Sequence, residues 1–145
     1  MQSIRIYEMP ACKMVSSGTG MFGEEKFDLF EKWFSSPKRS LFPKDFLYQA
    51  EEGFVWLYIF EEGMTVPPEF EIIDFRGGLY AVATDIDQQT DKGLMDTEID
   101  KFLTANGFKR DRSRSELGNV ITSPLAQEIM GYAQMDYYIP VEAEK

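Results

Sequence analysis

An aromatic segment that ends in acidic residues occurs twice in this chain, and it limits what the chain can fold into. The first copy is WLYIFEEG at residues 56–63, and the second is MDYYIPVE at residues 135–142. Around both copies the hydrophobic pattern predicts the same order of elements, which is a strand, a helix and two further strands. The chain is therefore predicted to be a duplicated half-domain.

The two halves can be aligned over two stretches. IYEMPACKMV lies over IDFRGGLYAV, and LYIFEE lies over YYIPVE. This alignment pairs Tyr58 with Tyr138 and Glu62 with Glu142. The identities are few, but their order along the chain is consistent, which indicates a tandem repeat.

Both predicted helices have clear ends. Phe27, Phe30 and Phe34 recur at helical spacing before the segment Ser35–Pro37 ends the first helix. The second helix is predicted near Asp91–Asn106, and Gly107 ends it.

These elements predict an α+β fold. We expect two tandem strand-helix-strand-strand repeats with pseudo-twofold symmetry, an antiparallel sheet with the helices on one face, and a ligand cleft. The length predicts a single domain over residues 1–145, with half-repeats at about residues 1–70 and 71–145. A sheet with both helices on one face leaves the other face in need of cover or of a ligand.

The composition favours a soluble cytoplasmic protein. Apolar residues make up 43% of the chain, but no run approaches the roughly 20 apolar residues that span a membrane. The segment MQSIRIYEMP has no basic stretch followed by an apolar core, so we expect no signal peptide. Cys12 is the single cysteine and cannot form an internal disulfide.

The net charge of −10 argues against direct nucleic-acid binding and raises the local concentration of cations. With no histidine, the chain cannot build a Ser-His-Asp or Cys-His nucleophilic site. DIDQQTD lacks the central glycine and the final glutamate of a calcium loop. We therefore predict no metal and no cofactor.

A GxGxxG pattern occurs at GTGMFG, residues 18–23, between a strand and a helix. We reject a dinucleotide site there, because Glu24 and Glu25 open the helix where a pyrophosphate would bind. The preceding strand, with Pro10 and Lys13, is also not a buried parallel strand. A loop at the mouth of a cleft, carrying Phe22, is the better interpretation.

Strand alternation separates the two faces of each aromatic segment. In the first segment the aliphatic set, suited to pack under helices, is Val55, Leu57 and Ile59, and the aromatic set is Phe54, Trp56, Tyr58 and Phe60. In the last strand one face holds Met135, Tyr137, Ile139 and Val141, and the other holds Asp136, Tyr138, Pro140 and Glu142. Trp56, Tyr58 and Tyr138 could line one cleft, or the aromatic residues could simply form the core.

Four acids lie on or near this predicted cleft: Glu62, Glu116, Asp136 and Glu142. A carboxylate beside aromatic rings suits an organic cation, because the rings add cation–π attraction to the opposite charge. Partial burial of such an acid would also raise its pKa and give it acid/base capacity.

Over essentially its whole length the chain resembles the GyrI-like, or AraC-type, effector-binding domain family, which includes drug-binding domains of multidrug-responsive transcription activators. The resemblance rests on YEMPACKMVSSG, FEKWF, FVWLYIFEEG, GGLYAVATDID, ANGF, ELGNVITSP and above all MDYYIPVE. It implies two pseudo-twofold repeats around an aromatic pocket, with a glutamate that pairs with lipophilic cations. By motif position that glutamate is Glu116.

We therefore expect a stand-alone binding module for a small lipophilic cation, acting as a sensor or a sequestering protein rather than an enzyme. The predicted ligand-binding residues are Phe22, Trp56, Tyr58, Glu116 and Tyr138. Two alternatives from the same resemblance stay open: a hydrolase of electrophilic small molecules with Glu116 as general base, and a protein-interaction module like the gyrase inhibitor. The oligomeric state is left open.

Overall fold

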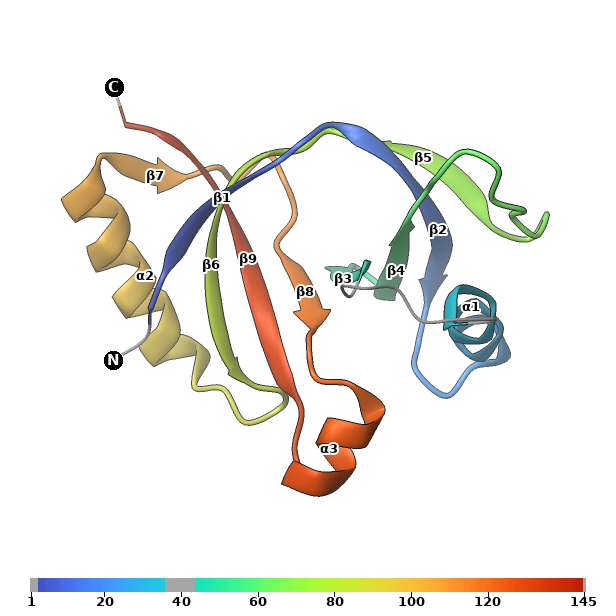
Figure 1. Cartoon of the computed structure of the whole chain (residues 1–145). Helices are drawn as coiled ribbons and strands as arrows, with labels where there is room; N and C mark the ends of the chain where they lie inside the picture. Colours follow the sequence, from blue (N-terminus) through green and yellow to red (C-terminus); the bar gives the residue numbers. More distant parts are fainter. Residues whose placement is uncertain (1–2, 36–43, 145) are drawn as a thin grey trace. The chain divides into compact units, whose positions relative to one another are not determined.

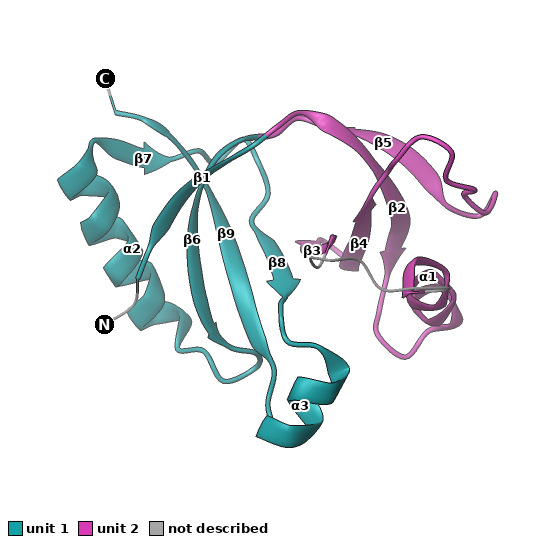
Figure 2. Cartoon of the chain, in the orientation of Figure 1, with its two compact units in different colours: residues 1–9, 78–145 teal, residues 10–77 magenta. Residues whose placement is uncertain are grey.

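The computed structural model describes residues 3–35 and 44–144 of the chain, which form two compact units (Figures 1 and 2). Unit 2 spans residues 10–77, and unit 1 consists of the residues up to 9 together with those from 78 onwards. In the described part of the chain, no helix is long and apolar enough to span a membrane.

Unit 2 is an antiparallel sheet with one helix on it. Its strands are β2 (Cys12–Gly20), β3 (Asp45–Ala50), β4 (Gly53–Ile59) and β5 (Glu71–Phe75), in the order β3-β4-β2-β5. Helix α1 (Glu25–Ser35) buries Phe27 and Phe30, which are three residues apart on one side of the helix. The Glu24 carboxylate accepts a hydrogen bond of 2.6 Å from the Met21 backbone N–H and closes the start of α1.

Unit 1 repeats this plan. Its main strands are β1 (Arg5–Met9), β6 (Gly78–Ile86), β8 (Leu117–Val120) and β9 (Gln134–Ala143), in the antiparallel order β1-β6-β9-β8. The short strand β7 (Phe108–Arg110) also pairs with β9, and the helices are α2 (Lys92–Asn106) and α3 (Pro124–Met130).

The predicted ends of α2 are confirmed. The Asp91 side chain accepts a hydrogen bond from the Leu94 backbone N–H. Gly107 has a φ of 81°, in the left-handed region, and donates its backbone N–H to the Leu103 carbonyl. The end predicted for the first helix at residues 35–37 lies partly outside the described residues.

The α+β class and the antiparallel pairing are confirmed, and the strand-helix-strand-strand order recurs with β7 and α3 inserted in the second half. The spatial units differ from the half-repeats, because each half-repeat contributes its first strand to the other unit. Strand β1, from the first half of the chain, pairs with β6, and β5 pairs with β2.

Alternation along β9 separates two faces in unit 1, as the sequence predicted. One face packs under α2 in a core of Ala81, Ala83, Met95, Ile99, Leu103, Ile139 and Val141. Asp136 and Tyr138 alternate with these residues and point away from α2. Figure 1 shows α2 lying along this sheet.

The face prediction for β4 was wrong. Trp56 belongs to the core under α1 with Val15, Phe27, Phe30 and Phe70, and Tyr58 packs against that core. Alternation shows that the aliphatic and aromatic sets separate, but not which set meets the helix. Helix α1 is itself rich in aromatic residues, and aromatic rings pack favourably on one another.

The alignment of the two half-repeats is also out of register, because it matches residues that lie on different faces of their sheets. It pairs Tyr58, which lies against the α1 core, with Tyr138, which points away from α2. Since a shift of one residue turns every side chain to the other face of a strand, this alignment does not match the helix-covered faces of β4 and β9.

Replacing Phe30 by alanine should destabilise the protein by about 3–5 kcal/mol, the usual cost of deleting a buried aromatic ring. Phe30 is fully buried and contacts Trp33, Phe34, Trp56 and Phe70. The neighbouring Leu29, which is 43% exposed, is the control, and Leu29→Ala should change stability by less than about 0.5 kcal/mol. Equal losses in urea denaturation would contradict this packing of α1.

Candidate functional site

Asp136 is a buried acid on the face of the unit 1 sheet that points away from α2. Only 6% of the residue is exposed. Its carboxylate accepts a hydrogen bond from the Thr84 hydroxyl and another from Nη2 of Arg5, which lies 3.2 Å from Oδ2. Asn119, also buried, lies opposite Asp136 on β8. The hydrogen bonds from Thr84 and Arg5 offset the cost of removing the Asp136 charge from water.

Tyr138 lies two residues along β9 on the same face. Its ring meets Tyr80 edge-on, with 6.0 Å between the ring centroids. Burial raises the pKa of Tyr138, the charge of Asp136 raises it further, and the charge of Arg5 lowers it. Tyr138 and Asp136 share one face of β9. We call Arg5, Thr84, Asn119, Asp136 and Tyr138 the Asp136 cluster.

Glu116 lies in a different part of unit 1, immediately before β8. Its carboxylate is 3.5 Å from Nζ of Lys92 and 3.6 Å from Nη1 of Arg110. The Glu116 side chain is 51% exposed and borders a hollow of about 190 Å³, which is also lined by Arg110, Asp111, Arg112, Arg114, Ile139 and Pro140. A cationic ligand at Glu116 would have to compete with two cations of the protein.

Arg114 stabilises the structure beside this hollow. It donates from Nε to Asp111 at 2.8 Å and from Nη2 to the carbonyls of Leu79 and Val141, both at 2.9 Å. Hydrogen bonds from Ser113 and Arg114 hold the pKa of Asp111 well below its usual range. Because both charged groups are buried and held by several bonds, this pair is structural.

Phe22, Trp56 and Tyr58 come together in unit 2. The ring centroids of Phe22 and Trp56 are 5.3 Å apart, and Tyr58 stacks on Phe34 at 5.1 Å. The Trp56 indole donates to Asp45 at 3.0 Å, and burial raises the pKa of that acid. Glu116 and Tyr138 belong to the other unit, and the ligand-binding roles of all five residues stay predictions.

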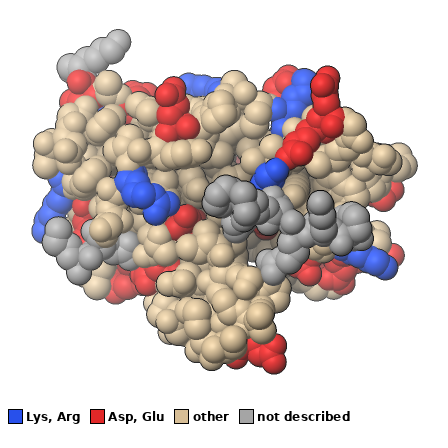
Figure 3. Space-filling model, viewed as in Figure 1, with Lys and Arg blue, Asp and Glu red and all other residues tan. Residues whose placement is uncertain are grey.

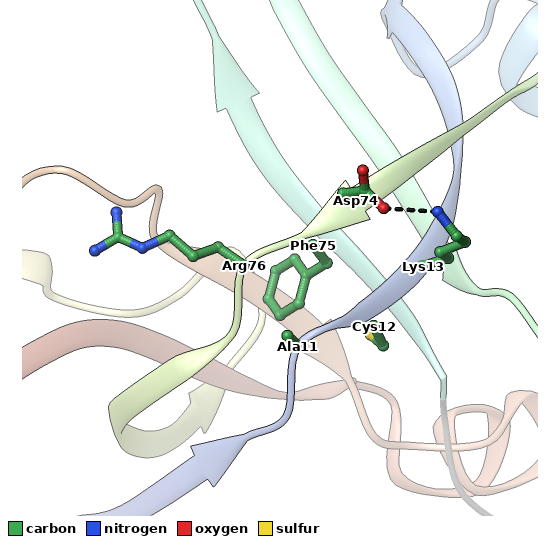
Figure 4. A pocket seen from close by; sticks show the side chains of 6 residues that line it. All are labelled: Ala11, Cys12, Lys13, Asp74, Phe75 and Arg76. Atoms are coloured by element: carbon green, nitrogen blue, oxygen red, sulfur yellow. Dashed lines mark hydrogen bonds and ion pairs between the residues drawn. The ribbon is translucent and has the colours of Figure 1, made fainter.

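A larger hollow, of about 590 Å³, lies in unit 2 where β2 and β5 pair (Figure 4). It is lined by Ala11, Cys12, Lys13, Asp74, Phe75 and Arg76. Lys13 and Asp74 neutralise each other through a bond of 2.7 Å. Burial raises the pKa of the Cys12 thiol, which keeps it protonated and weakly nucleophilic at neutral pH.

Helix α3 presents an apolar surface. None of its residues is buried, and Leu125 and Ile129 are its most exposed large side chains. Ser123 caps the start of α3 and Gly131 caps its end, and these caps stabilise the helix although none of its residues is buried. In Figure 3 the surface over α3 is mostly uncharged. A surface with so few polar groups has little to orient a small ligand, so we place the candidate site at the Asp136 cluster.

Within residues 3–35 and 44–144, no three acidic or cysteine side chains come together in a way that would hold a metal ion.

Sequence reasoning named Asp136 among the acids near the cleft but missed Arg5, Thr84 and Asn119. One signal was present in the first strand, where Ile4 and Ile6 alternate with Arg5 and Tyr7. The two isoleucines pack against the α2 core, so Arg5 is directed to the same face as Asp136.

No protein-family model and no curated protein sequence matches the chain. Its fold does match solved structures. The C-terminal domain of EcmrR is 11% identical, with a TM-score of 0.64 over 99% of both chains. The EcmrR chain in a complex with DNA matches 98% of this chain and is covered over 58% of its own length, with 11% identity and a TM-score of 0.63.

A hydrolase from Listeria innocua is 9% identical, with a TM-score of 0.66 over 96% of this chain and 91% of that one. At these identities the likeness shows the fold alone. The fold agrees with the one that the resemblance to GyrI-like effector-binding domains implies.

The two charges of the Asp136 cluster should move the pKa of Tyr138 in opposite directions. Asp136→Asn should lower it, and Arg5→Gln should raise it further. Titration of labelled tyrosine by ¹³C NMR, with Tyr138→Phe to assign the signal, measures both shifts. Two unchanged pKa values would place Tyr138 away from these charges.

The raised pKa of Tyr138 also has a consequence for stability. Above the ordinary tyrosine pKa of about 10, the unfolded chain loses this proton while the folded chain keeps it. The free energy of unfolding should therefore fall as the pH rises through this range, and the fall should be smaller in Tyr138→Phe.

Proposed function

We propose that this chain is a binding module for small lipophilic molecules with a positively charged group, acting as a sensor or a sequestering protein. The observation that carries the proposal is the buried carboxylate of Asp136 on the same face of β9 as Tyr138, which is the sheet face opposite α2. In this proposal Asp136 supplies the counter-charge and the Tyr138 ring an aromatic contact.

Burial favours Asp136 over Glu116 for this role. A charge pair shielded from water attracts more strongly than an exposed one, because the surroundings screen it less. Asp136 is almost fully buried and has one cationic partner, Arg5, whereas the Glu116 side chain is half exposed and lies near two, Lys92 and Arg110. We therefore assign Glu116 a secondary role at most.

Two further features support a binding module. The net charge of −10 attracts cations to the protein as a whole. The fold is shared with the C-terminal domain of EcmrR, a protein seen in a complex with DNA. By analogy of fold only, this chain would respond to a ligand, as the resemblance to effector-binding domains implies.

The proposal predicts selective binding of cations. In calorimetry, 1-naphthylmethylammonium should bind with a dissociation constant below about 1 mM, and the neutral 1-naphthylmethanol should bind more weakly. Asp136→Asn should weaken binding of the cation about tenfold or more, because a buried charge-assisted bond is lost.

Asp74→Asn is the matched control, since it removes an acid whose ion pair with Lys13 is exposed. It should leave the affinity almost unchanged. Equal binding of the alcohol and the ammonium ion, or an unaffected Asp136→Asn protein, would refute the assignment of Asp136 as counter-charge.

A further inference from the structure

The two side chains of the ion pair between Arg5 and Asp136 differ in their exposure to solvent. The Asp136 side chain is 8% exposed, whereas that of Arg5 is 58% exposed. Arg5 reaches the carboxylate through Nη2 at 3.2 Å, which is longer than a strong charge-assisted hydrogen bond. The acid is fixed in the sheet, and its cationic partner lies largely in water.

The pair of Arg114 and Asp111 shows what a permanent ion pair looks like in the same unit. There both side chains are buried, the bond is 2.8 Å, and two carbonyls accept further hydrogen bonds from the guanidinium. The Arg114 guanidinium also lies 4.7 Å from the centre of the Tyr80 ring. The contact of Arg5 with Asp136 is longer and far more exposed, so it is easier to exchange.

The strand register explains how Arg5 can leave. Arg5 lies on β1, at one end of the strand order, opposite Val82 of β6. Val82 in turn lies opposite Tyr138 of β9, so the Arg5 side chain crosses β6 to reach Asp136. A long, flexible side chain can withdraw by changing rotamers, with the backbone pairing of β1 intact, while Thr84 still donates to Asp136.

We propose that Arg5 is a built-in competitor of the ligand. Its guanidinium occupies the cation position at Asp136, and a ligand binds by exchanging with it, so Arg5 sets both the affinity and the selectivity of the site. The proposal rests on the function proposed above and adds the chemical class of the ligand.

That class is an aromatic amidine or guanidine. The position at Asp136 already accepts a planar, N–H-donating guanidinium, on the same sheet face as Tyr138. An amidinium can donate to the carboxylate in the same way and can stack on an aromatic ring. A quaternary ammonium ion has no N–H to donate, so it cannot replace the bond that Arg5 gives up.

Calorimetry with benzamidine tests the proposal. Arg5→Gln should bind benzamidine about three- to fivefold more tightly than the wild type, the change expected when an exposed competing ion pair is removed. Lys101→Gln is the control, because it removes one exposed positive charge from α2 and should have a smaller effect. Asp136→Asn should weaken binding with or without Arg5→Gln, and benzyltrimethylammonium should bind more weakly than benzamidine.

A measurement on the wild type complements the variants. On addition of benzamidine, the NMR signal of the Arg5 Nε–H group should move towards that of a solvated arginine, with the same midpoint as the calorimetric titration. A saturated complex in which this signal is unchanged would overturn the exchange.

These titrations separate a failure of the competitor role of Arg5 from a failure of the cation site at Asp136. If Arg5→Gln leaves the affinity for benzamidine unchanged or lower while Asp136→Asn still weakens it, the competitor role is wrong and the cation site stands. If benzyltrimethylammonium binds as tightly as benzamidine, the amidine class is wrong. If neither the wild type nor Arg5→Gln binds benzamidine or naphthylmethylammonium, both proposals fall.

Discussion

The structure of unit 1 depends on the pairing of β6 with β9, because these two strands contribute both to the core under α2 and to the buried charge of Asp136. Alternate residues along the two strands point to opposite sides of the sheet. One side packs Ala81, Ala83 and Ile139 under α2, and the other holds Thr84 and Asp136 in hydrogen-bonding contact. The apolar side stabilises the sheet. A buried carboxylate lowers stability unless its hydrogen-bond partners offset the cost of removing it from water. The apolar side therefore allows the opposite side to keep the buried Asp136.

Much of this fold could be predicted from the sequence, because the signals are local. The caps at Asp91 and Gly107 lie next to the helix that they delimit, and the two faces of β9 follow from alternation alone. The packing of β4 could not be predicted in this way. Alternation separates Trp56 and Tyr58 from Leu57, but only the helix that arrives from elsewhere in the chain decides which face is covered.

The candidate site was harder to predict, because its contacts join residues that are distant in sequence. Arg5 and Asp136 are 131 positions apart and meet only because β1 and β9 flank β6. Motif position pointed instead to Glu116, which the fold brings close to Lys92 and Arg110. A motif can locate an acid along the chain, but the burial of that acid and the number of cations around it depend on the folded structure.

Two proposals remain to be tested together, that Asp136 is the cation site and that Arg5 gives way to the ligand. A crystal structure of the protein with benzamidine would test both. An amidinium nitrogen should lie about 2.7–2.9 Å from a carboxylate oxygen of Asp136, with the Arg5 side chain turned into solvent. Benzamidine bound elsewhere, beside Glu116 for example, with the contact between Arg5 and Asp136 intact, would contradict both.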